Sequence, residues 1–173
     1  MPSSSPSPVE RSFSERTLSE QEQLAVFLDA HRATLRATLE GMTEEEVRAR
    51  LVPSLTTLLG LVKHATFFHV VWYQEAITGT PRTQLGQPDS VDDSFRVSEK
   101  DTISSVLAAY DSACAIGREV GASHDLDEVV TGHRMGAMTL RWIHLQALRE
   151  LAQHSGHADI LREQLLAARE SGG

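Results

Sequence analysis

The sequence predicts an all-α protein, a four-helix bundle with a long crossover between its second and third helices. Three observations lead to this prediction: apolar residues recur at three- and four-residue steps in four stretches, capping signals precede those stretches, and no strand-like alternation stands out. A length of 173 residues fits one domain. We expect residues 1–17, which are rich in Ser and Pro, to form a flexible lead-in, and residues 18–170 to form a single bundle domain.

The first two long helices are predicted from their caps. Ser19, followed three residues later by a glutamate, forms a capping box that opens a helix, and Gly41 is the expected end of that helix. Thr43 begins a second capping pattern, which predicts a short helical turn. Ser54 is expected to cap the second long helix, over residues 55–77.

The other two long helices follow a connection without a helical period. Residues 78–100 carry several Gly and Pro residues, and a connection of this length can cross from one end of a bundle to the other. Thr102, or Asp101 before it, is expected to start the third helix, and Gly121 to end it. After an irregular stretch, Thr139 caps a fourth helix that continues toward the C-terminus.

Glu150, His154 and His157 are the first residues to suggest chemistry. On a helix they fall within roughly 60° of one face, and the side chains of Glu150 and His154, four residues apart, can reach a common point. A carboxylate and an imidazole are frequent metal ligands, and His64, on the apolar face of the second helix, is the best candidate for a third. Two alternatives stay open: a core histidine at position 64 with one hydrogen-bond acceptor, and an ion pair of Glu150 with a nearby arginine.

Composition excludes several classes of function. The net charge of -8 disfavours a nucleic-acid partner and an anionic membrane surface, and no apolar run approaches the roughly 20 residues that cross a bilayer. The N-terminus lacks a signal-peptide pattern, and the single cysteine, Cys114, is expected to be a small buried hydrophobe. We therefore expect a cytoplasmic protein. A homodimer is the expected assembly, because two-fold dimers are the commonest oligomers. His124 and His133 are expected in solvated loops.

Longer runs of the sequence carry a family resemblance. Residues 53–65, PSLTTLLGLVKHA, resemble the second-helix motif of the DinB-like superfamily, in the branch of actinobacterial mini-circle proteins. Residues 150–163, ELAQHSGHADILRE, resemble the C-terminal signature of that branch, and the section from Asp93 to Cys114 is similar too. The resemblance covers about residues 18–166.

The resemblance implies a divalent metal ion, most often zinc or nickel, bound in the bundle by three side chains. His64 matches the ligand on the second helix. Glu150 and His154 match the Glu-and-His pair of the related thiol-dependent maleylpyruvate isomerases, whereas Ala158 breaks the two-histidine pattern of many other members. His157 could replace Glu150 as a ligand, or act on a bound substrate by moving a proton.

Relatives of known activity are S-transferases that use mycothiol or bacillithiol, and a mycothiol-dependent isomerase. The resemblance thus implies a small-thiol S-transferase in which a metal ion activates the thiol of the cosubstrate and holds its sulfur near an electrophile. Two other classes fit the same ligands: a non-catalytic metal-binding bundle of stress-related or partner-binding role, and a metal-dependent hydrolase.

Overall fold

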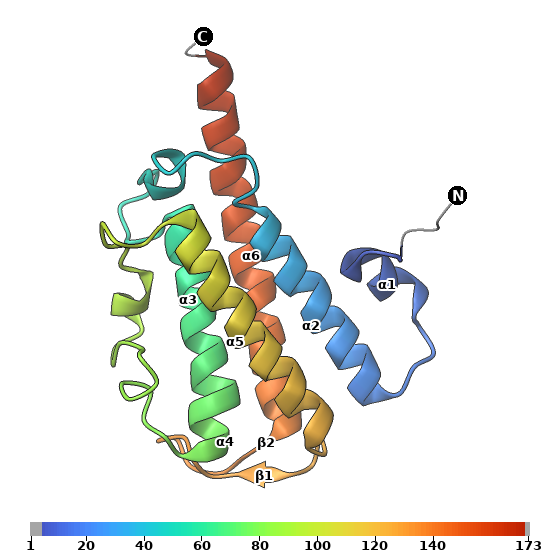
Figure 1. The fold of residues 1–173 in the computed structure, drawn as a ribbon. Helices are drawn as coiled ribbons and strands as arrows, with labels where there is room; N and C mark the ends of the chain where they lie inside the picture. The colour runs from blue at the N-terminus through green and yellow to red at the C-terminus, as the bar shows by residue number, and fades with distance from the viewer. Residues whose placement is uncertain (1–4, 172–173) are drawn as a thin grey trace.

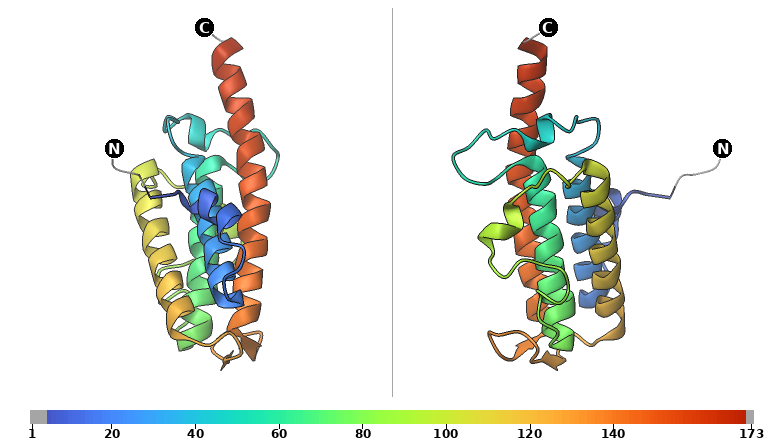
Figure 2. Two further views of the ribbon diagram at one scale, coloured as in Figure 1. Left: turned by 90° about the vertical axis from the view of Figure 1, so that its right-hand side faces the viewer. Right: turned by 60° about the vertical axis from the view of Figure 1, so that its left-hand side comes forward.

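The computed structural model describes residues 5–171, in which four long helices pack into a bundle (Figure 1). They are α2 (Glu20–Ala37), α3 (Leu58–Val70), α5 (Ile103–Ser123) and α6 (Leu140–Ser171); α3 continues through a π-helical turn, η2 (Val71–Glu75), into α4 (Ala76–Thr78). Helices α2 and α6 run in one direction and α3 and α5 in the other (Figures 1 and 2). The predicted all-α bundle, with its crossover between the second and third long helices, is confirmed.

Polar side chains cap the first turns of these helices, and one of the caps is not the predicted residue. Ser19 forms the predicted capping box at α2, and Thr102 forms another at α5. Ser54, in contrast, does not cap the second long helix: its hydroxyl bonds to Thr56, and the cap is Thr57, whose side chain accepts from the backbone N–H of Gly60 at 3.0 Å. The helix therefore starts at Leu58.

The helix ends also differ from the expectation. Helix α2 stops at Ala37, and Gly41 closes the turn after it with a φ of +71°. Gly121 does not end α5, which continues to Ser123. A Cβ atom at position 121 would lie 3.1 Å from the ring of His144, so glycine here serves close packing of α5 against α6.

One short helix and one short pair of strands were not predicted from the sequence. Residues 8–14 of the expected flexible lead-in form helix α1 (Pro8–Ser14), capped by Ser7 and packed beside α2 (Figure 1); residues 1–4 lie outside the described part. Strands β1 (Val129–Val130) and β2 (Met138–Thr139) pair antiparallel before α6, and two residues are too few to show strand alternation. Thr139 then caps α6, as predicted, by accepting from the N–H of Trp142 at 3.2 Å.

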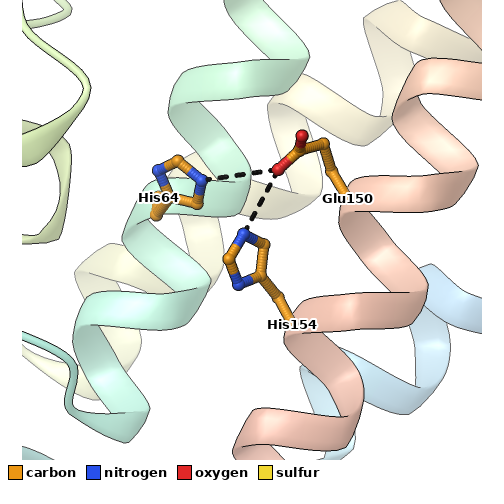
Figure 3. Close-up of side chains that lie close together, drawn as sticks. All are labelled: His64, Glu150 and His154. Atoms are coloured by element: carbon orange, nitrogen blue, oxygen red, sulfur yellow. Dashed lines mark ion pairs between the residues drawn. The ribbon is translucent and has the colours of Figure 1, made fainter.

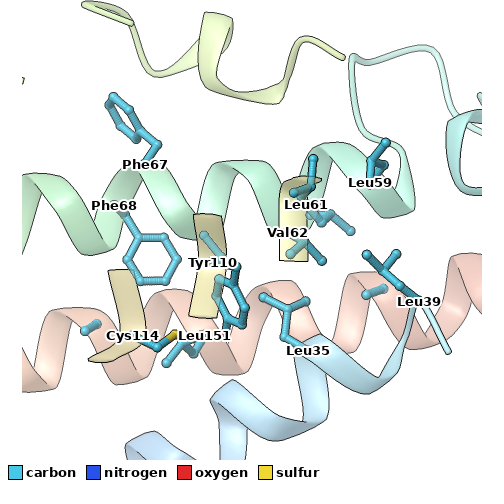
Figure 4. Packing of buried hydrophobic residues seen from close by; sticks show 14 of the residues in the cluster. Leu35, Leu39, Leu59, Leu61, Val62, Phe67, Phe68, Tyr110, Cys114 and Leu151 are labelled. Atoms are coloured by element: carbon cyan, nitrogen blue, oxygen red, sulfur yellow. The ribbon is translucent and has the colours of Figure 1, made fainter. Parts of the chain in front are cut away.

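The apolar core surrounds α3, which is buried over almost its whole length (Figure 4). Leu35, Leu61 and Leu151 bring α2, α3 and α6 together and are fully buried. Burial of one such side chain stabilises the fold by about 1.5–3 kcal/mol. Cys114 is buried among them, as predicted. No helix within residues 5–171 is long and apolar enough to cross a membrane.

The crossover, residues 79–102, forms a strap that runs along α3 from one end of the bundle to the other (Figure 2). It contains the 3-10 turn η3 (Asp92–Phe95), which packs directly on α3. A Cβ atom at Gly60 would lie 2.8 Å from the carbonyl oxygen of Phe95. The absence of a side chain at Gly60 therefore lets the strap pack directly against the backbone of α3. Lys63 fixes its far end through an ion pair of 2.7 Å with Asp101.

Candidate metal centre

Three side chains from two helices converge inside the bundle (Figure 3). His64 comes from α3, and Glu150 and His154 come from successive turns of α6. One donor atom of each lies within 4.8 Å of the others: Glu150 Oε2 is 3.3 Å from His154 Nε2 and 3.9 Å from His64 Nε2. Metal bonds of about 2.0–2.2 Å place tetrahedral ligands roughly 3.4 Å apart, so a small inward movement would bring these donors to one cation.

The strap sets the orientation of the His64 ring. Ser94 Oγ lies 2.7 Å from His64 Nδ1 and donates its own proton to the carbonyl oxygen of Val91, so it accepts from Nδ1–H. The ring of Phe95 stacks on the other side at 4.0 Å between centroids. Burial lowers the pKa of His64 and favours the neutral ring. The lone pair on Nε2 then faces the carboxylate of Glu150, an arrangement that a cation between them would stabilise.

Glu150 uses its two oxygens for different partners. Oε1 accepts from Gln146 Nε2 at 2.9 Å and from Arg149 Nη2 at 3.2 Å, which leaves Oε2 to face the two imidazoles. The hydrogen-bonding contact with His154 is the largest of the effects that lower the pKa of Glu150, so the group is a carboxylate. The ion pair of Glu150 with a nearby arginine, the alternative left open by the sequence, does form with Arg149. It uses Oε1, however, and leaves Oε2 free to face the histidines.

His154 and His157 lie in different surroundings. His154 is buried, and its Nδ1 has no hydrogen-bond partner among residues 5–171. His157 is exposed, its ring centroid is 5.7 Å from that of His154, and it lines a separate cavity of about 280 Å³ with Val52 and Ile160. The structure therefore gathers three of the four candidate residues. The role of His157, as a ligand or in catalysis, stays a prediction.

A second cavity, of about 230 Å³, borders the three-residue cluster. His64 and Glu150 form part of its wall, and the rings of Phe67, Phe68 and Trp72 form much of the rest. A cation held by the three residues would border this cavity through His64 and Glu150.

His133, at the rim of this cavity, corrects one expectation from the sequence. It is buried rather than solvated, because Arg82 Nη2 donates to its Nε2 at 3.0 Å. Arg82 also pairs with Glu75 at 2.7 Å, and all three groups are buried. These contacts join η2, the strap and the loop after β1, so spacing along the sequence could not reveal them. Gly132, whose N–H donates to the carbonyl oxygen of Ala76, is the one local sign of close packing there.

A separate polar cluster lies beyond the candidate site. Arg32 is buried and donates to His69 Nε2 at 3.0 Å and to Asp29 at 3.0 Å. The hydroxyl of Tyr73 forms a hydrogen bond of 2.8 Å with His144 Nδ1. Burial lowers the pKa of His144 to about 4, so this ring is neutral near pH 7. His69 and His144 thus join helices together and do not belong to the group of three.

Comparison with known proteins returns one family. A family model described as Mycothiol-S-transferase matches residues 23–167, a range that includes His64, Glu150 and His154. A search of curated proteins finds no match to the chain.

Proposed function

The chain belongs to the mycothiol-S-transferase family, within the DinB-like superfamily, and on this premise we propose that it joins mycothiol, through its thiol sulfur, to a small electrophile at a divalent metal ion. The proposed ligands of the ion are His64, Glu150 and His154, and zinc or nickel suits two imidazoles and one carboxylate. The observation that carries the proposal is the convergence of three donor atoms within 4.8 Å beside a cavity.

The residues around the site would divide the work. A bound divalent ion would lower the pKa of a thiol beside it and so favour the thiolate at neutral pH. Glu150 supplies the negative charge of the ligand set, while Ser94 and Gln146 hold His64 and Glu150 in orientation. In the reaction the thiol S–H bond breaks and its proton leaves, a carbon–sulfur bond forms, and the leaving group departs with its electron pair.

The proton acceptor can be tested at His157. We propose His157 for this role, by way of solvent, since the ring is exposed and lies one turn from the ligands. In His157→Gln, the pH dependence of kcat should change while the metal content stays the same. An unaltered pH profile would remove His157 from the mechanism.

The surroundings of the protein follow from the cosubstrate. A thiol cosubstrate must stay reduced and Cys114 is unpaired, which supports the cytoplasm as the proposed location. We also propose a two-fold dimer, because this is the commonest assembly of oligomeric proteins, and light scattering would measure its mass.

The function is tested with protein purified without a histidine tag. We expect about one divalent ion per chain by elemental analysis, and conjugation of mycothiol to 1-chloro-2,4-dinitrobenzene in the loaded protein. Glu150→Gln should lose both, whereas Glu163→Gln, an equal change at an exposed position of α6, should lose neither. An ion without conjugation would favour the non-catalytic bundle, turnover without thiol would favour the hydrolase, and absence of an ion would end the proposal.

A further inference from the structure

We propose that the cavity beside the three ligands takes a small aromatic electrophile with an anionic substituent, such as a carboxylate, and that Arg134 binds this substituent. The inference rests on the proposed function and names the class of its second substrate. Mycothiol supplies only the thiol, so the chemistry of the cavity bears on the electrophile.

The size and walls of the cavity select a small aromatic group. Its volume of about 230 Å³ is below the roughly 300–1,000 Å³ of common ligand pockets. Phe67, Phe68 and Trp72 contribute three aromatic rings to its lining. Trp72 is held in place edge-to-face by Trp142, with 5.3 Å between the centroids. Such rings favour stacked or edge-to-face contact with another aromatic ring.

The charges at the cavity leave one cation without a partner. The Nε and Nη2 groups of Arg82 donate to Glu75 and His133, and its guanidinium lies 5.5 Å from the centroid of the Phe67 ring. Arg134 also lines the cavity but is exposed, and no carboxylate within residues 5–171 forms an ion pair with it. In a chain of net charge -8, this guanidinium is the group at the mouth that attracts an anion.

The backbone around Arg134 is fixed although its side chain is exposed. His133 before it is buried and bonded to Arg82. One residue earlier, Gly132 N–H donates to the carbonyl oxygen of Ala76 at 3.1 Å. The loop is therefore attached to the end of the α3–α4 helix. Arg134 can bind a ligand in the cavity by moving its side chain alone, while the backbone keeps its position.

A matched pair of electrophiles separates the carboxylate from the ring. In both 4-chloro-3,5-dinitrobenzoate and 2-chloro-1,3-dinitrobenzene, which differ only in the carboxylate, the thiolate sulfur attacks the carbon that carries chlorine. The carbon–sulfur bond forms, chloride leaves with the electron pair of the broken bond, and the thiol proton goes to solvent. The ratio of kcat/KM for the two compounds measures how strongly the enzyme selects the anionic group.

Arg134→Gln is the decisive variant. We expect the ratio to fall about tenfold, equivalent to about 1.4 kcal/mol, mainly through a higher KM for the carboxylate. Arg134→Lys should restore most of the ratio because it keeps the charge. Arg16→Gln removes the same charge from an exposed position outside the cavity lining and should leave the ratio as it is. A ratio in Arg134→Gln equal to that of the natural sequence overturns the inference and leaves the proposed function standing.

A binding measurement with an unreactive compound tests the assignment of Arg134 separately from the proposed transferase function. The unreactive compound 3,5-dinitrobenzoate should quench the tryptophan fluorescence of the zinc-loaded protein, and Arg134→Gln should weaken this binding about tenfold. If that result comes with no thiol conjugation, the transferase proposal fails while the anionic aromatic ligand is supported. If dinitrobenzoate binds no more tightly than 1,3-dinitrobenzene, the assignment of Arg134 is wrong.

Discussion

Ser94→Ala tests whether the strap orients His64, one of the proposed metal ligands. The change removes the hydroxyl that accepts from His64 Nδ1–H at 2.7 Å, at a place where both residues are buried. Without that acceptor, the proton can move to Nε2 and donate to Glu150, which occupies the nitrogen that a cation would need. The substitution therefore acts on metal binding before it acts on folding.

The two effects have different expected sizes. Loss of a hydrogen bond to a ligating histidine typically lowers metal affinity 10- to 100-fold, equivalent to about 1.4–2.7 kcal/mol. The metal-free protein should lose less than about 1 kcal/mol, because the new Nε2–H bond to Glu150 replaces the old bond. Competition with a fluorescent zinc chelator measures the first quantity, and urea unfolding of the metal-free protein measures the second.

Ser90→Ala is the matched control for this prediction. Ser90 lies on the same strap, and its exposed hydroxyl donates to the carboxylate of Asp93 at 2.8 Å, away from the three proposed ligands. Zinc affinity should stay unchanged there. The reasoning is refuted if Ser94→Ala keeps the zinc affinity of the natural sequence while the metal-free protein loses the full 1–3 kcal/mol of an unsatisfied buried donor.

Three further outcomes are expected. Gly60→Ala places a methyl group 2.8 Å from the carbonyl oxygen of Phe95, so the strap must shift; urea unfolding should show a loss of about 1–3 kcal/mol and chelator competition a weaker site. Acidification should destabilise the fold through His144, because its pKa of about 4 in the folded state lies below its ordinary value of 6.5. The unfolded chain therefore binds the proton first, and stability falls between pH 6.5 and 4 by up to about 3 kcal/mol, a slope that His144→Gln should flatten in unfolding curves. Chelation of bound metal should lower Tm in calorimetry, and zinc at a hundred times its Kd should add about 2.7 kcal/mol.

Each of these outcomes has a control or a contrary result. Gly156→Ala adds a Cβ with no atom within 4 Å and should stabilise α6 slightly, in contrast to the change at Gly60. Equal pH slopes for the natural sequence and His144→Gln would show that another group causes acid sensitivity. A Tm that does not respond to zinc would mean that no cation binds the folded state.

Local signals in the sequence were sufficient for the four long helices. Ser19 and Thr102 open helices as predicted, because capping depends on residues within one turn. The cap predicted at Ser54 is formed instead by Thr57, three residues later, which offers an equally good hydroxyl beside the first N–H groups of α3. Helix α1 was missed because its Ser- and Pro-rich composition is also typical of flexible segments, although Ser7 and Glu10 form a capping box.

The candidate site was predictable only where helix geometry decides it. Glu150 and His154 are four residues apart on α6, and the apolar face of α3 directs His64 inward. Ser94 and Arg82 could not be found in this way, because the strap brings them to the site through contacts between distant segments. In helical projection His157 shares a face with Glu150 and His154, but its side chain lines another cavity.

The wide turn η2 has a consequence for how this protein could change over time. A π-helical turn holds one more residue than the α-helical turn it replaces. Deletion of a single residue within Val71–Glu75 would therefore restore a uniform α-helix and leave the residues on either side of the turn close to their present orientation. The change would fall on the turn itself, which contributes Val71 and Trp72 to the cavity wall and Glu75 to the buried pair with Arg82. The three side chains proposed to bind a metal lie outside this turn. Length variation at this one turn could therefore redirect specificity without rebuilding the chemical centre.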